Sequence, residues 1–72
     1  MNFGERIRIL REKHELTQTE VANYLKTTQS YYAQYERGLR QMPFERAVEL
    51  AKLYGVSLDY LGGLTEDINK HW

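Results

Sequence analysis

Residues 17–38 read TQTEVANYLKTTQSYYAQYERG and predict two short helices joined by a three-residue turn. Thr17 is a strong N-cap residue, and Glu20 stands three positions later, where its side chain can return a hydrogen bond to the cap. A helix therefore begins near Gln18. Its inner face holds the apolar residues Val21, Ala22 and Leu25.

The second helix of this segment is expected over residues 29–37. The turn before it has poor helix propensity, and its last residue, Thr28, is a good N-cap. Gly38 ends the helix, because glycine adopts the left-handed conformation with little strain. The inner face is aromatic, with Tyr32 and Tyr35 three positions apart.

The outer face of the second helix carries polar or small side chains and no acid: Gln29, Ser30, Ala33 and Gln34. Glutamine can pair through two hydrogen bonds with adenine in the major groove, whereas an acid would be repelled by phosphate. This helix is therefore a candidate for reading the bases of double-stranded DNA.

Several residues of this segment follow a known pattern: Gln18, Ala22, Tyr32, Tyr35 and the closing Glu36-Arg37-Gly38. Their spacing resembles the helix-turn-helix of the phage-repressor and Cro (XRE-like) family. Arg6-Ile7-Arg8 with Leu10-Arg11 is similar to the first helix of that family, and residues 55–61 are similar to its fifth. The resemblance implies an all-α, compact five-helix lambda-repressor-like DNA-binding domain over residues 1–63, with the helix-turn-helix at residues 18–37.

Two positions depart from the family pattern. Lys26 occupies the turn position that usually holds glycine, so it must accept a positive φ at a cost of about 1 kcal/mol or alter the turn. Thr27 follows where Val or Ile is common. Both departures suggest an adjusted angle between the two helices.

Three further helices are expected. Phe3, Ile7, Leu10 and His14 recur at helical spacing and predict an amphipathic helix over residues 4–14, with Ile9 exposed. Pro43 is expected at the first position of a fourth helix that ends at Gly55. Ser57 caps a short fifth helix, flanked by the apolar pair Val56 and Leu61. The expected inner face of the fourth helix is Phe44, Ala47, Leu50, Ala51 and Tyr54.

The composition fits a small intracellular module. The chain has 72 residues, of which 42% are hydrophobic, enough for one domain with a modest core. It has no cysteine, no signal-peptide stretch and no run that could cross a bilayer, so a cytoplasmic protein is expected. We do not expect the protein to be an enzyme, and we expect no metal site, cofactor or small-molecule ligand. His14 and His71 stand apart, and the adjacent Glu66 and Asp67 fit the first turn of a helix better than a catalytic pair.

The net charge of zero argues against a strongly basic DNA-binding domain, but the charges are unevenly distributed. Residues 1–41 hold seven Lys/Arg and five Glu, a net charge of +2. Residues 42–72 hold three Lys/Arg and five acids, a net charge of −2. This weak asymmetry would orient the domain on DNA, and affinity is expected to depend on dimerisation.

Contacts with DNA can be assigned to individual residues. Gln29 and Ser30 are the first candidates for base edges, Gln34 is the next, and Ala33 suits a thymine methyl group. Contacts to the DNA backbone are expected from Gln18, Thr28, Tyr31, Arg37, Arg40 and Gln41, with Lys26 a weaker candidate. Alternatives stay open: Gln18 could simply start a helix, Tyr31 could be a core or surface tyrosine, Arg40 could reach the minor groove, and Arg37 or Lys26 could be solvated.

Arg11 and Glu36 are interpreted together. The family resemblance implies that this arginine of the first helix pairs with this glutamate at the end of the recognition helix. A partly buried pair of this kind would hold the recognition helix at its angle, with no direct role in DNA binding. The alternative is two solvated surface charges.

The tail over residues 64–72 offers a possible dimer contact. Thr65 could cap a short helix that places Leu64, Ile68 and Trp72 on one stripe. We expect a homodimer formed by this tail and the fifth helix, with candidate contacts at Leu58, Leu61, Leu64, Ile68 and Trp72. Alternatively, the chain is a fragment of a longer regulator.

Two functional classes follow. The first is a sequence-specific transcriptional regulator, a repressor that binds a near-palindromic operator as a dimer. The second is a protein-interaction module, such as an antitoxin that covers a toxin and regulates its own synthesis. A polar, uncharged helix face beside the basic residue Arg40 favours the first class.

Overall fold

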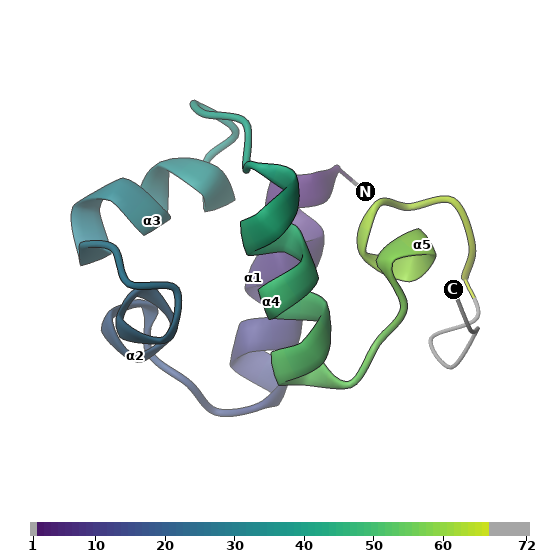
Figure 1. Ribbon diagram of the computed structural model, residues 1–72, viewed down its shortest axis with the longest axis horizontal. Coiled ribbons are helices and arrows are strands. Elements are labelled where there is room, and N and C mark those ends of the chain that lie inside the picture. Colours follow the sequence, from purple (N-terminus) through teal and green to yellow (C-terminus); the bar gives the residue numbers. More distant parts are fainter. Residues whose placement is uncertain (1, 67–72) are drawn as a thin grey trace.

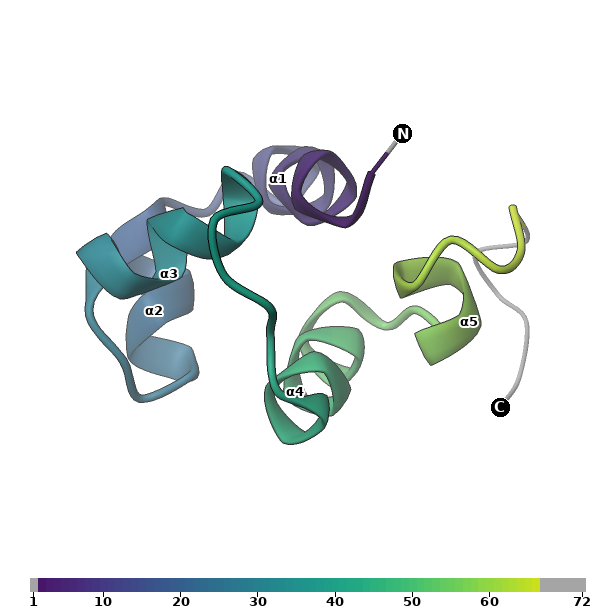
Figure 2. The same ribbon diagram turned by 90° about the horizontal axis from the view of Figure 1, so that it is seen from above.

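The computed structural model describes residues 2–66, which form five α-helices (Figure 1). The helices are α1 (Phe3–Lys13), α2 (Gln18–Tyr24), α3 (Gln29–Glu36), α4 (Phe44–Tyr54) and α5 (Leu58–Leu61). Helices α2 and α3 lie on one side of the α1 and α4 pair, and α5 lies on the other (Figures 1 and 2). The all-α, five-helix architecture expected from the sequence is therefore confirmed.

One hydrophobic core joins the helices. Its largest fully buried side chains are Tyr32, Tyr35, Ile7, Leu10, Leu50, Leu61 and Val21. Two of these are tyrosines of α3, so this helix is anchored by large aromatic rings that bury much apolar surface. Ile9 is exposed, as its place off the apolar stripe of α1 predicted.

Side-chain caps define where most helices begin. Thr17 accepts a hydrogen bond from the Glu20 amide at 3.0 Å, and the Glu20 carboxylate accepts one from the Thr17 amide at 2.8 Å. Thr28 caps α3 and Ser57 caps α5, both as expected. A second capping box, which was not expected from the sequence, begins α1: the Asn2 side chain accepts a hydrogen bond from the Glu5 amide at 2.8 Å.

Three boundary predictions were wrong by one residue. Helix α1 spans residues 3–13 instead of 4–14, and α3 ends at Glu36 with Arg37 as its C-cap. Pro43 is the N-cap of α4, in extended backbone with ψ 150°, where its fixed φ is equally acceptable. The backbone groups at the ends of a helix lack hydrogen-bond partners within the helix. The first or last residue can therefore shift by one position at little cost in free energy.

Phe44 is a larger error, because its side chain is 68% exposed and does not belong to the inner face of α4. Helical periodicity gives the direction of a side chain around the axis, but not how far along the axis a neighbouring helix extends. At the first turn of α4 no neighbour covers the ring. Leu50, Ala51 and Tyr54, further along the same stripe, are buried.

The turn between α2 and α3 contains a left-handed residue that is not glycine. Lys26 has φ 61°, so of the two alternatives left open by the sequence it accepts the left-handed conformation. Glu15 also has a positive φ, of 58°, which was not anticipated. Both residues store backbone strain that glycine would not carry.

Gly4 allows α1 to pack closely on the C-terminal end of α3. A Cβ atom at this position would clash with the Glu36 carbonyl and would lie 2.9 Å from the Tyr35 carbonyl oxygen. Only glycine fits this approach, which sets the distance between the two helices. Within residues 2–66, every helix is too short or too polar to cross a lipid bilayer.

Candidate nucleic-acid interface

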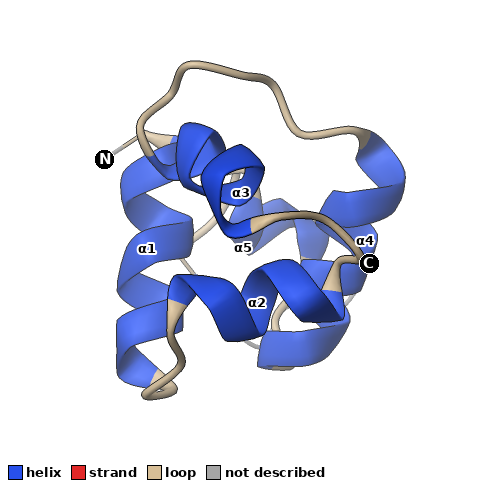
Figure 3. Cartoon of the chain, turned by 90° about the vertical axis from the view of Figure 1, so that its left-hand side faces the viewer, coloured by secondary structure: helices blue, strands red, loops and turns tan. Residues whose placement is uncertain are grey.

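Helix α3 lies across α2 at the surface of the molecule (Figure 3). On its inner face the side chains of Tyr32 and Tyr35 are buried in the core. Gln29 and Ser30 are exposed at its N-terminal end. Ala33 and Gln34, one turn later, are half-buried. The four predicted base-reading residues therefore share one outward face of a well-anchored helix.

The carboxylate of Glu36 is the centre of a buried hydrogen-bond network. Arg11 binds it through two hydrogen bonds, Nε to Oε2 at 2.7 Å and Nη2 to Oε1 at 3.1 Å. The Tyr32 hydroxyl donates to Oε2 at 2.6 Å. The side chains of Arg11 and Glu36 are only 12% and 3% exposed, so this ion pair joins α1 to the end of α3 in a region of low dielectric.

The network shifts the ionisation of its members. Burial by itself would raise the pKa of the Glu36 carboxyl, but hydrogen bonds from Arg11, Tyr32 and Gln18 outweigh it and lower that pKa below its ordinary value. The hydrogen bond to Glu36 raises the pKa of Arg11. Burial raises the pKa of Tyr32, and it raises that of Tyr54 to about 12.

The same carboxylate is linked to the base-reading face through two glutamines. The Gln18 Nε2 group donates to Glu36 Oε1 at 3.0 Å, and the Gln29 Nε2 group donates to Gln18 Oε1 at 2.6 Å. Because a carboxylate only accepts, it determines which way the Gln18 amide points, and Gln18 then determines the orientation of Gln29. Gln29 keeps its Oε1 acceptor and one N–H donor available.

A cluster of arginine and tyrosine lies beside α3. The Arg40 guanidinium carbon is 4.4 Å from the centre of the Tyr31 ring, and Arg40 Nε donates to Gln34 Oε1 at 3.2 Å. Arg46 of α4 donates to the Tyr35 hydroxyl at 2.8 Å and lies 5.6 Å from the same Tyr31 ring. Sequence reasoning missed Arg46, although it is the only basic residue in the first two turns of α4.

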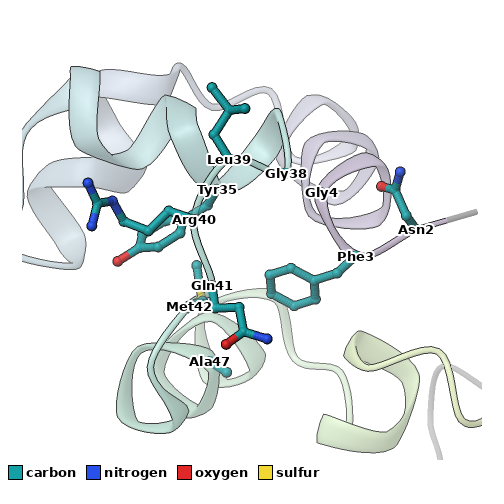
Figure 4. A pocket seen from close by; sticks show the side chains of 10 residues that line it. All are labelled: Asn2, Phe3, Gly4, Tyr35, Gly38, Leu39, Arg40, Gln41, Met42 and Ala47. Carbon is teal, nitrogen blue, oxygen red and sulfur yellow. The ribbon is translucent and has the colours of Figure 1, made fainter.

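The remaining predicted backbone contacts are spread around α3. Thr28 is the N-cap of α3, Arg37 is its C-cap, and Gln41 lies in the loop that follows. All three are exposed, as is Lys26. This loop borders a hollow of about 730 Å³ between α1 and α4, which is also lined by Phe3 and Ala47 (Figure 4).

The predicted dimer contacts in the described part of the chain differ in their exposure. Leu61 is 1% exposed and belongs to the core, because α5 packs its C-terminal leucine inward, so its assignment to a dimer interface was wrong. Leu58 is half-buried, whereas Leu64 is 82% exposed. Ile68 and Trp72 lie outside the described residues, as do His71 and Asp67.

Other charged and aromatic residues have structural partners. The His14 ring packs against the Tyr54 ring in a tilted arrangement with 4.9 Å between ring centres, and its Nδ1 is 2.9 Å from the Leu10 carbonyl oxygen. Glu66 pairs with the buried Arg6 at 3.3 Å. Over residues 2–66, no cluster of three His, Asp or Glu side chains could hold a metal ion.

Comparison with known proteins gives matches over most of the chain. The sequence model of the family described as "Helix-turn-helix" matches residues 7–61. The chain is 41% identical over 65 residues, 90% of its length and 58% of the relative, to the uncharacterized HTH-type transcriptional regulator YobD of Bacillus subtilis. It is 39% identical over 56 residues, 78% of its length and 50% of the relative, to the cryptic phage CTXphi transcriptional repressor RstR of Vibrio cholerae.

A solved structure agrees with these relatives. The P22 c2 repressor, crystallised in complex with a synthetic operator, superposes with a TM-score of 0.78 at 30% identity and covers 85% of this chain and 92% of that one. By contrast, the chain spans between 50% and 58% of the length of YobD and RstR. The family match over most of the chain and the shared fold establish that this chain belongs to the helix-turn-helix family, in its phage-repressor and Cro type.

Proposed function

We propose that this chain is the DNA-binding domain of a sequence-specific transcriptional regulator that inserts α3 into the major groove. One observation carries this proposal: the exposed Gln29 amide is oriented through Gln18 by the buried Glu36 carboxylate. A surface glutamine normally rotates freely, so a fixed one serves recognition that depends on the direction of its amide. The named functions of the relatives support the same proposal.

The orientation of Gln29 favours adenine. With one N–H engaged by Gln18, the amide offers one acceptor and one donor. Adenine presents a complementary N6 donor and N7 acceptor, whereas guanine presents two acceptors in the major groove. Ser30 and Gln34 would contact neighbouring base edges, and Ala33 would touch a thymine methyl group.

The DNA backbone would be held on both sides of α3. Gln18 has a second N–H for a phosphate while it keeps its bond to Glu36. Thr28 and Tyr31 lie in or beside the first turn of α3. Arg37, Arg40 and Gln41 follow its C-terminal end. We propose further that the protein acts as a dimeric repressor on a near-palindromic operator, whose half-sites would lie about 10 bp apart.

Selection of bound sequences from a random duplex library at near-physiological salt tests this function. An inverted repeat with half-sites about one helical turn apart is expected from the wild-type protein. Asn23→Ala, which removes an exposed amide from α2, serves as control and should recover the same sequence. Recovery of duplexes without sequence preference would contradict the proposal and would leave a protein-interaction module as the better explanation.

A further inference from the structure

We propose that Arg46 is a further contact to the DNA backbone, and that with Arg40 it forms a pair of guanidinium groups that bind the phosphates next to Tyr31. This inference rests on the proposed function and extends it to a residue of α4, outside the helix-turn-helix. Its basis is the convergence of two arginines from different segments on a single ring of α3.

Both guanidinium carbons lie within about 6 Å of the centre of the Tyr31 ring, the range of a cation–π interaction. The ring offsets only part of the repulsion between two like charges, since an exposed contact of this kind is weak. Within residues 2–66, neither Arg40 nor Arg46 takes part in an ion pair. An anion is therefore the group that would complete the cluster.

An acid that borders this cluster, Glu49, has other partners. Glu49 and Arg46 border the same small hollow, together with Lys26. The Glu49 carboxylate, however, accepts from the Tyr24 hydroxyl at 3.5 Å and pairs with Lys52 at 4.0 Å. The hollow thus adds a third cation, Lys26, to the same flank of α3.

Arg46 is held in place by a hydrogen bond and still has N–H donors available for a phosphate. Its Nη1 donates to the Tyr35 hydroxyl at 2.8 Å, which ties the guanidinium to the buried side of the recognition helix. A guanidinium carries five N–H donors in a planar fork that suits phosphate oxygens. Arg40 is held in the same way by Gln34. Two preorganised guanidinium groups beside a base-reading helix fit a polyanionic backbone.

The salt dependence of DNA binding separates this role from a purely structural one. Each phosphate contact contributes about −0.9 to the slope of log K against log salt concentration. We expect Arg46→Gln to make that negative slope less steep by about 0.9 and to weaken binding roughly tenfold, whereas Arg46→Lys should keep the wild-type slope. Lys52→Gln, which removes the same charge from the far end of α4, should leave the slope unchanged.

Folding is monitored by thermal unfolding of each variant, and Arg46→Met, which keeps the aliphatic stem, provides a second neutral variant. A wild-type slope in whichever neutral variant is folded would overturn the role of Arg46 while leaving the proposed function intact. A wild-type protein that shows no salt-dependent binding would overturn both. An equal loss of slope in Lys52→Gln would also contradict a specific contact.

Discussion

At the scale of single residues, Glu36 has the greatest structural effect. Its carboxylate accepts hydrogen bonds from Arg11, Tyr32 and Gln18 and is almost completely buried. One ionised group thus ties α3 to α1 and also orients the amides of Gln18 and Gln29 on the face proposed to meet DNA. If that proposal holds, stability and recognition depend on the same side chain.

Replacing this carboxylate should be costly. Glu36→Gln leaves the Arg11 guanidinium in a largely buried site without a counter-charge, so we expect a loss of about 3–5 kcal/mol in the free energy of unfolding. Urea denaturation followed by circular dichroism measures it. Glu12→Gln is the control, because Glu12 forms an exposed pair with Arg8 at 3.9 Å and should cost less than about 0.5 kcal/mol. Equal losses in the two variants would contradict the buried network.

The lowered pKa of Glu36 also predicts a pH dependence. Since this pKa is lower in the folded than in the unfolded chain, the stabilisation is fully present above the ordinary value of 4.5 and is lost as pH falls through the folded value. Melting temperatures between pH 7 and pH 3 should therefore fall more steeply for the wild-type protein than for Glu36→Gln. Parallel curves for the two proteins would show that Glu36 does not titrate in this way.

At the scale of helices, caps and turns were largely predictable from the sequence because they rest on contacts within four residues. Thr17, Thr28 and Ser57 cap the helices where their local pattern placed them. The exposure of Phe44 and the approach of Arg46 to α3 could not be predicted, because both depend on how far α4 extends relative to helices distant in sequence.

The close packing of α1 on α3 should tolerate no side chain at Gly4. Alanine has the better helix propensity, yet its Cβ would strike the α3 backbone, so we expect Gly4→Ala to lose about 1–3 kcal/mol in unfolding free energy. At Gly62 the nearest atom to an added Cβ is 3.4 Å away, so Gly62→Ala should change stability little. If Gly4→Ala proved as stable as Gly62→Ala in urea denaturation, the helix approach would not be limited by this contact.

The strained turn between α2 and α3 allows the opposite prediction. Lys26→Gly should raise the free energy of unfolding by up to about 1 kcal/mol, because glycine adopts the positive φ without a Cβ clash. Lys52→Gly, within α4, should lower it by about 1 kcal/mol. Chemical denaturation of both variants compares them directly, and a loss of stability in Lys26→Gly would mean that the left-handed turn carries no strain.

At the scale of the whole molecule, the basic side chains beside α3 offset the low net charge of the chain. Arg40 and Arg46 lie beside the Tyr31 ring, and Lys26 borders the same hollow as Arg46 and Glu49, so the flank of α3 proposed to meet DNA carries more basic groups than acids. Composition alone placed Arg46 with the acidic half. In the folded chain Arg46 lies close to the basic residue Arg40, beside the Tyr31 ring.

Base discrimination by Gln29 is the most direct test that α3 reads DNA. Affinities for the selected site and its single base-pair variants would be measured by fluorescence anisotropy for the wild-type protein, Gln29→Ala and the control Asn23→Ala. We predict that Gln29→Ala loses about 1–3 kcal/mol of discrimination for adenine at one base pair of each half-site, while Asn23→Ala keeps it. Unchanged discrimination at every position in Gln29→Ala would contradict base reading by this oriented amide.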